Sequence, residues 1–214
     1  PAPRAAGGGR GGRGVAGAAR VGARVGCPGR DGFPFEPGPP RVTRPAVLGQ
    51  LFADTGAQAE LSLTAVDPAC SYVFGDGTTL VLPHDAAQVP AALDAALGAG
   101  AGASWQRLHA RSRRLWELVG EPVLRRPVSM AALARMSTRP GDLRAVAPWL
   151  TIVGIGRRML PDARLRTWLN RYPTCSGTDP RRHPAVLSVT SLVDQSVGAW
   201  NVLGGLRRSV EAMG

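Results

Sequence analysis

The sequence predicts an α/β protein, with an α+β order in the part present: a few strands, a long helical block and a return strand. Three observations predict this order. Residues 72–82 alternate aromatic and β-branched positions around Gly75-Asp76-Gly77, which is a hairpin signal. Apolar residues recur at helical spacing between 85 and 182. Residues 198–202 then have an extended pattern. With 214 residues, 44% of them hydrophobic, the chain can bury a sizeable core.

The first 20 residues form a tract rich in Gly and Arg, and Val15 is its one large apolar residue. Such a tract cannot bury enough surface to offset chain entropy, so we expect residues 1–20 to be disordered. Gly7, Gly9 and Gly12 match G-x-G-x-x-G, but no strand pattern precedes them. A dinucleotide-binding loop needs that strand. An RGG-type RNA-binding tail is the alternative interpretation of this tract.

The remaining elements follow from short patterns. Residues 46–53 have helical spacing, and Leu61 and Leu63 flank Ser62 as in a strand. Ser104 and Asp162 are expected to cap helices. Gly204-Gly205 predicts a tight turn. The predicted helices beyond residue 84 cover 85–97, 104–119, 129–136, 142–159, 162–172, 183–194 and 206–213.

The apolar faces of these helices are also predicted. In the first, Val89, Leu93 and Leu97 share one face. In the helix over 183–194, the inward positions are predicted to be Val186, Leu187, Thr190 and Val193. Four tryptophans lie on helices flanked by Arg, a composition typical of a membrane interface but also of an ordinary core: Trp105, Trp116, Trp149 and Trp168.

Charge and cysteine content limit the possible functions. The net charge is +11 and every base is Arg, which is typical of GC-rich coding DNA, so we expect no specific nucleic-acid partner. Cys27, Cys70 and Cys175 are far apart, so we expect no metal site and a reducing, cytoplasmic compartment. No apolar run reaches the length of about 18 residues that indicates a membrane-spanning helix. His84, His109 and His183 are isolated and are interpreted as structural or surface residues.

Several longer motifs carry a family resemblance. Gly22-Ala23-Arg24 is followed by Asp31-Gly32-Phe33-Pro34-Phe35-Glu36-Pro37-Gly38-Pro39. A second motif consists of Arg164-Leu165-Arg166, then Arg171-Tyr172, then Ser176-Gly177-Thr178-Asp179-Pro180. A third consists of Gly198-Ala199-Trp200 followed by Gly204-Gly205. With these motifs the chain resembles the carotenoid (phytoene-type) desaturases, FAD-dependent flavoproteins of the amine-oxidase-like group.

The resemblance implies a partial Rossmann-like FAD-binding domain and a substrate domain with a small β-sheet and a helical block. It implies a remnant of the FAD domain at 21–60, substrate-domain strands at 61–84, a helical substrate- and membrane-facing block at 85–182, and a return to both domains at 183–214. FAD contacts are expected from Gly22, Ala23, Arg24, Gly38 and Pro39. Substrate contacts are expected from Trp200, Gly204 and Gly205.

The implied activity is desaturation of a lipophilic polyene such as phytoene, with hydride transfer to the flavin and peripheral contact with a membrane. No catalytic side chain is assigned. The sequence departs from the family in lacking its opening strand and glycine-rich loop, and Val15 stands where a ribose-binding acid is expected. We therefore expect a fragment, and its activity alone and its oligomeric state stay open.

Two other classes of function stay open. The first is a related flavoprotein, namely a carotenoid isomerase, a ketolase or an amine oxidase. The second is a non-catalytic basic fragment that binds a membrane or nucleic acid, for which binding would depend steeply on salt.

Overall fold

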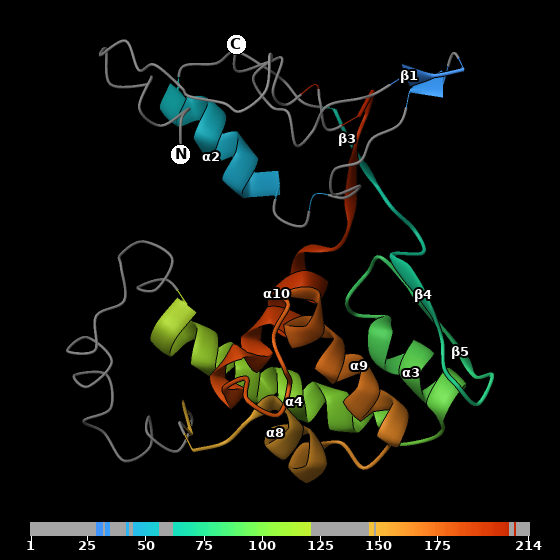
Figure 1. The fold of residues 1–214 in the computed structure, drawn as a ribbon, viewed down its shortest axis with the longest axis vertical. Coiled ribbons are helices and arrows are strands. Elements are labelled where there is room, and N and C mark those ends of the chain that lie inside the picture. The colour runs from blue at the N-terminus through green and yellow to red at the C-terminus, as the bar shows by residue number, and fades with distance from the viewer. Residues whose placement is uncertain are drawn as a thin grey trace. The chain divides into compact units, whose positions relative to one another are not determined.

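The computed structural model describes residues 29–31, 33–34, 42, 45–55, 62–120, 146–147, 149–205 and 208 (Figure 1). The predicted disordered tract at 1–20 and the predicted helix at 129–136 lie outside these residues. So does all but residue 208 of the predicted helix at 206–213. Two units divide the chain: Pro1–Asp67 with Val197–Gly214, and Pro68–Ser196. The predicted segments 61–84 and 183–214 therefore each contribute to both units.

The first unit contains a short antiparallel ladder centred on β6 (Trp200–Val202). β6 pairs with β3 (Leu63–Ala65), and its other edge bonds Val42 through backbone hydrogen bonds of 2.8 and 3.0 Å at Trp200. The same unit holds α2 (Pro45–Thr55), which confirms the helix predicted at 46–53. β1 (Gly29–Arg30) and β2 (Phe33–Pro34) form a separate antiparallel pair.

The second unit begins with the predicted hairpin. β4 (Cys70–Val73) pairs antiparallel with β5 (Thr79–Leu82). The turn forms because Asp76 Oδ1 accepts a hydrogen bond from the Thr78 N–H at 2.9 Å and because Gly77 adopts a φ of +81°. Leu80 and Leu82 alternate with exposed positions, so one face of the hairpin contributes to the core.

The other described elements of this unit are helical. In chain order they are α3 (Val89–Leu97), α4 (Ala101–Leu115), the π-helix η2 (Trp116–Gly120), α8 (Ile152–Met159), α9 (Ala163–Cys175), the 3₁₀ turn η3 (Ala185–Ser188) and α10 (Val189–Val197). Asp162 caps α9 as predicted, because its Oδ1 accepts from the Arg164 N–H at 2.7 Å.

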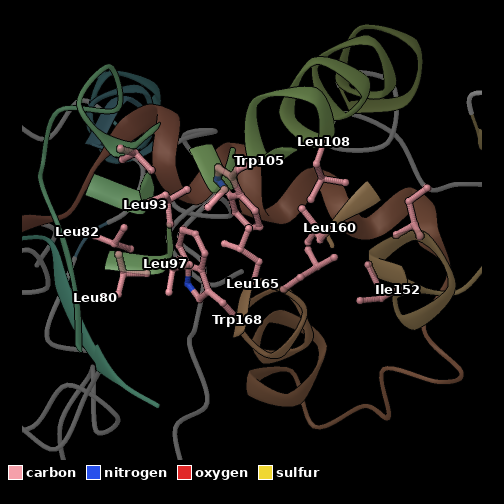
Figure 2. Close-up of a cluster of buried hydrophobic side chains, with 14 of the residues drawn as sticks. Leu80, Leu82, Leu93, Leu97, Trp105, Leu108, Ile152, Leu160, Leu165 and Trp168 are labelled. Atoms are coloured by element: carbon pink, nitrogen blue, oxygen red, sulfur yellow. The ribbon is translucent and has the colours of Figure 1, made fainter. Parts of the chain in front are cut away.

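One hydrophobic cluster joins these elements. Figure 2 shows leucines of β5 and α3 at one end of the cluster, Trp105 and Trp168 in the middle, and Leu160 and Ile152 at the other end. The buried face of α3 is formed by Val89, Leu93 and Leu97, as its spacing predicts. The cluster therefore fixes α3, α4, α8 and α9 relative to the hairpin within this unit.

One predicted helix start is wrong, and another predicted helix is interrupted. α4 begins at Ala101 and not at Ser104, because the carboxylate of Asp94 on α3 accepts the Gly102 N–H at 2.9 Å and caps the earlier start. The helix predicted over 142–159 is interrupted: its start lies outside the described residues, Val146 is helical, and α8 begins at Ile152 with Thr151 as its cap. Ala147, which precedes Pro148, has a φ of +43°, so an unbroken helix cannot pass through it.

The inward face predicted for residues 183–194 is also wrong. Leu187 and Thr190 are exposed, whereas Ala185, Ser188 and Ser191 are buried. Small serines are tolerated there because their hydroxyls are satisfied: Ser191 Oγ donates to the Ser188 carbonyl at 2.7 Å. Ser188 Oγ lies 3.3 Å from Ser112 Oγ of α4. Val189 and Leu192 are buried with these serines, and Val186 and Val193 are half-buried, so the buried face is shifted from the predicted one.

The described elements confirm a mixed α+β architecture, with helices and small antiparallel strand pairs. No strand pair among them is parallel, so they give no Rossmann-like sheet. No helix within the described ranges is both long enough and apolar enough to span a bilayer.

Candidate functional site

The predicted FAD-contact residues lie outside the described residues: Gly22, Ala23, Arg24, Gly38 and Pro39. Their role stays a prediction. The three predicted substrate residues, Trp200, Gly204 and Gly205, are described and lie together at β6 and the turn that follows it.

Trp200 is held at the centre of the ladder in the first unit. Its backbone bonds Val42, and its indole N–H donates to the Val197 carbonyl at 2.7 Å. Because the one polar atom of the side chain is satisfied by its own chain, the half-buried ring offers only apolar surface to a ligand.

Gly204 and Gly205 form the predicted turn, with φ values of +82° and +91°. The Gly205 N–H donates to the Val202 carbonyl at 2.9 Å, which closes the turn directly after β6. Left-handed backbone at both positions accounts for glycine there. A Cβ on Gly204 would meet only the flexible end of Arg208, so steric crowding is not the reason for this residue.

Arg164, from the most specific motif of the sequence, is a structural residue. Its guanidinium binds Asp162 at 2.7 Å, donates to Thr78 Oγ1 at 3.0 Å and donates to the Leu97 carbonyl at 3.0 Å. One side chain thereby ties the start of α9 to the hairpin turn and to the end of α3. The hydrogen bond from Arg164 also lowers the pKa of the Asp162 carboxyl.

Arg171 and Tyr172 of the same motif tie α9 to α10 and to the hairpin. The Tyr172 hydroxyl donates to Asp194 Oδ2 at 3.1 Å, and Arg171 pairs with the same carboxylate at 3.4 Å. The guanidinium also lies 5.4 Å from the ring centroid of Tyr72. Burial raises the pKa of Tyr72 to about 12, against the opposing charge of Arg171.

The tryptophans do not form one surface. Trp105 and Trp168 are 1% and 2% exposed and stack with ring centroids 4.2 Å apart, so in this fold they are core residues and not interface residues. Trp116 is half-buried, and Trp149, beside the start of α8, is 61% exposed.

A surface cavity of about 390 Å³ lies in the second unit, between the start of α3, the middle of α4 and the end of α10. Its walls include Val89, Pro90, Trp105, His109, Arg113 and Gln195. A volume in the range of about 300–1,000 Å³ is typical of small-molecule sites.

The cavity wall holds an ordered aromatic group. The Trp105 indole N–H donates to Gln195 Oε1 at 2.9 Å, which fixes the ring edge to α10. The imidazole of His109 lies 5.0 Å from the Trp105 ring, centroid to centroid. Within the part of the chain that the structure describes, the buried atoms His109 Nε2 and Gln195 Nε2 have no hydrogen-bond partner.

Burial, with a smaller contribution from the nearby charge of Arg113, lowers the pKa of His109 to about 4. The ring is therefore neutral near pH 7 and carries one donor and one acceptor nitrogen. The sequence interpretation of His109 as an isolated structural or surface residue missed its place in a cavity wall. A signal was available, because Trp105, His109 and Arg113 follow one another at steps of four residues on one helix face. Gln195 is 90 residues from Trp105, and only the fold brings them together.

Comparison with known proteins identifies relatives over most of the chain, although no protein-family model matches it. A hydroxyneurosporene desaturase of Cereibacter sphaeroides is 28% identical over 184 residues, covering 84% of this chain. One of Rhodobacter capsulatus is 30% identical over 186 residues, covering 85%. A 4,4'-diapolycopene oxygenase of Methylomonas is 26% identical over 199 residues, covering 91%.

The chain is a relative of the carotenoid desaturases. The family resemblance stated from the motifs is thereby confirmed. This desaturase relative spans 37% of the length of each hydroxyneurosporene desaturase.

Proposed function

We propose that the chain forms part of an FAD-dependent oxidoreductase that desaturates a carotenoid precursor such as phytoene by hydride transfer to the flavin. The observation that carries the proposal is the similarity to desaturases along more than four fifths of the chain. Two of these relatives are named for hydroxyneurosporene, so the proposal includes hydroxylated polyenes among the substrates.

The environment of Trp200 supports a hydrocarbon substrate. A polyene chain has no hydrogen-bonding groups, and a half-buried indole whose N–H is already bonded to Val197 presents no unsatisfied polar atom to it. In the proposal Trp200, Gly204 and Gly205 lie near the polyene.

The described residues do not themselves fit a flavin nucleotide. Among them the glycine-rich helix starts of α4 and α8 are already capped: the Gly102 N–H is bonded to the Asp94 carboxylate, and the Gly154 N–H to Thr151 Oγ1. A phosphate could not replace that carboxylate without breaking the cap. The flavin contacts proposed at Gly22, Ala23, Arg24, Gly38 and Pro39 rest on the family resemblance, and we derive no catalytic step from the described side chains.

The proposal is tested by pigment conversion. The full chain, and a hybrid in which it replaces the matched 186 residues of the Rhodobacter capsulatus relative, are expressed separately in bacteria that accumulate phytoene or neurosporene derivatives. We expect the hybrid to give products that lack pairs of hydrogens and absorb at longer wavelength. A folded hybrid that retains FAD but converts none of these polyenes would refute the proposal.

Oxygenation is a second candidate, favoured by the diapolycopene oxygenase among the relatives. Mass spectrometry of the same extracts separates the two reactions, because desaturation removes two hydrogens and oxygenation adds oxygen.

We also propose peripheral membrane contact on the cytoplasmic side, by the surface around Trp149 and α8. Trp149 is exposed, and Arg157 and Arg158 are exposed in the last turn of α8. An exposed indole before the start of α8 and two exposed cations in its last turn are residue types that suit an anionic lipid interface. We expect Trp149→Ser to reduce flotation of the chain with anionic vesicles. The matched control Val73→Ser, at a position that is 76% exposed on the hairpin, should not reduce it. Equal flotation of both variants and the wild type would exclude this surface.

A further inference from the structure

The cavity beside α4 has a mainly apolar wall with several polar side chains, among them His109, Gln195 and Ser196. Carbon-only side chains come from three elements, among them Val89, Ala110 and Leu192. Two buried side-chain atoms of lining residues have no hydrogen-bond partner within the described residues, His109 Nε2 and Gln195 Nε2, whereas the Trp105 N–H and Gln195 Oε1 bond each other. A cavity of this kind is typical of a site that recognises one polar atom on an otherwise apolar ligand.

The volume limits the ligand to an end group. At about 30 Å³ for each water of the liquid, 390 Å³ corresponds to about 13 waters. A branched chain of about ten carbons with one oxygen fits such a space, whereas a complete carotenoid does not.

We propose that this cavity binds the hydroxylated end of an isoprenoid chain, with His109 as the hydrogen-bond partner of the hydroxyl. The inference rests on the proposed function for its substrate class, since it makes the cavity the feature that distinguishes hydroxylated from unhydroxylated polyenes. His109 acts in binding and specificity and takes no part in the redox step.

A hydroxyl fits this wall better than a carboxylate does. A neutral imidazole offers one donor and one acceptor, and a hydroxyl can complement either nitrogen. A carboxylate can only accept, and Arg113, the one charged group among the lining residues, is exposed to water that screens its charge. The apolar majority of the walls also disfavours a fully charged ligand.

The test uses the full chain and two matched ten-carbon probes, geraniol and 2,6-dimethylocta-2,6-diene, which share one skeleton and differ by a hydroxyl. Binding is followed by tryptophan fluorescence, to which Trp105 in the cavity wall contributes. We expect the wild type to bind the alcohol about three- to tenfold more tightly than the hydrocarbon, the effect of one neutral hydrogen bond.

Variants locate the effect. His109→Phe keeps an aromatic ring beside Trp105 and should abolish the preference for the alcohol, whereas His109→Gln, which keeps a donor and an acceptor, should retain part of it. His183→Phe makes the same exchange outside the cavity and should keep the preference. Ala110→Phe, at an exposed helical position of the wall, should weaken binding of both probes. Circular dichroism verifies the fold of each variant.

The inference is overturned if the wild type binds neither probe or binds both equally, if His109→Phe keeps the preference, or if Ala110→Phe binds both probes normally. These results are distinguishable from failure of the proposed function. Desaturation by the hybrid without the binding preference leaves the proposed function and removes this inference. The binding preference without desaturation does the reverse.

Discussion

The contact between α3 and α4 leads to a sharp prediction for Gly102→Ala. Gly102 lies in the first turn of α4, directly against the backbone of Pro90 on α3. A Cβ at residue 102 would overlap the Pro90 carbonyl oxygen and lie 2.8 Å from the carbonyl carbon and 2.9 Å from Cα. These atoms are backbone, so no side-chain rotation relieves the overlap.

Two effects oppose each other in this substitution. Alanine gains about 1 kcal/mol over glycine inside a helix, and less at a terminus. Overpacking costs about 1–3 kcal/mol, and the upper end applies because two backbones must separate. Separation also strains the 2.9 Å hydrogen bond from the Gly102 N–H to Asp94, worth about 1 kcal/mol. The net expectation is a loss of about 2 kcal/mol in the free energy of unfolding.

The assay is urea unfolding followed by circular dichroism, with Gly154→Ala as the matched control. A Cβ at Gly154 of α8 would lie 3.5 Å from Leu150 Cδ2 and from Thr151 Oγ1, which is ordinary contact, so this variant should gain up to about 1 kcal/mol. If Gly102→Ala is as stable as Gly154→Ala, the α3–α4 packing described above is incorrect.

Three further predictions concern the same unit. The pKa of His109 is about 4 when folded and 6.5 ordinarily, so the unfolded chain binds the proton first as pH falls. The free energy of unfolding should therefore drop between pH 6.5 and 4, by at most about 3 kcal/mol, and urea titrations of His109→Phe should show a smaller drop. Asp162→Ala should lose about 1–2 kcal/mol in thermal melts through the cap of α9, whereas Asp162→Asn should keep most of the cap; equal losses would contradict the capping role. Leu93→Ala should cost about 2–5 kcal/mol, against less than about 0.5 for the exposed Val73→Ala, and similar values for the two would argue against the core in Figure 2.

Local patterns predicted the elements whose causes are local. The hairpin at 70–82, the cap at Asp162, the face of α3 and the turn at Gly204-Gly205 all depend on residues within a few positions of one another. Pro148 was a local signal too, and it would have corrected the predicted helix over 142–159, because the residue before a proline is disfavoured in helical conformation.

The predictions were wrong where a residue far away in the sequence determines a helix start or the burial of a side chain. Ser104 has the chemistry of a cap, but the carboxylate of Asp94 takes that role for the helix that begins at Ala101. The burial of Ser188 depends on Ser112 of α4, 76 residues away. In the sequence, Trp105 and Trp168 are flanked by arginines, as tryptophans at a membrane interface are. Their stacking within the core is visible only in three dimensions.

The spacing of motifs such as Arg171-Tyr172 to Gly177 and Trp200 to Gly204-Gly205 was enough to find the resemblance to carotenoid desaturases without any knowledge of contacts, and the similarity to known desaturases confirms that resemblance. The sequence by itself also determined the mixed α+β order. Only the tertiary structure decided what those residues do: Arg164 and Arg171 hold elements together, and His109 lines a cavity with Trp105 and Gln195. The physical reason is that hydrogen bonding and burial depend on neighbours in space, which a linear pattern does not contain.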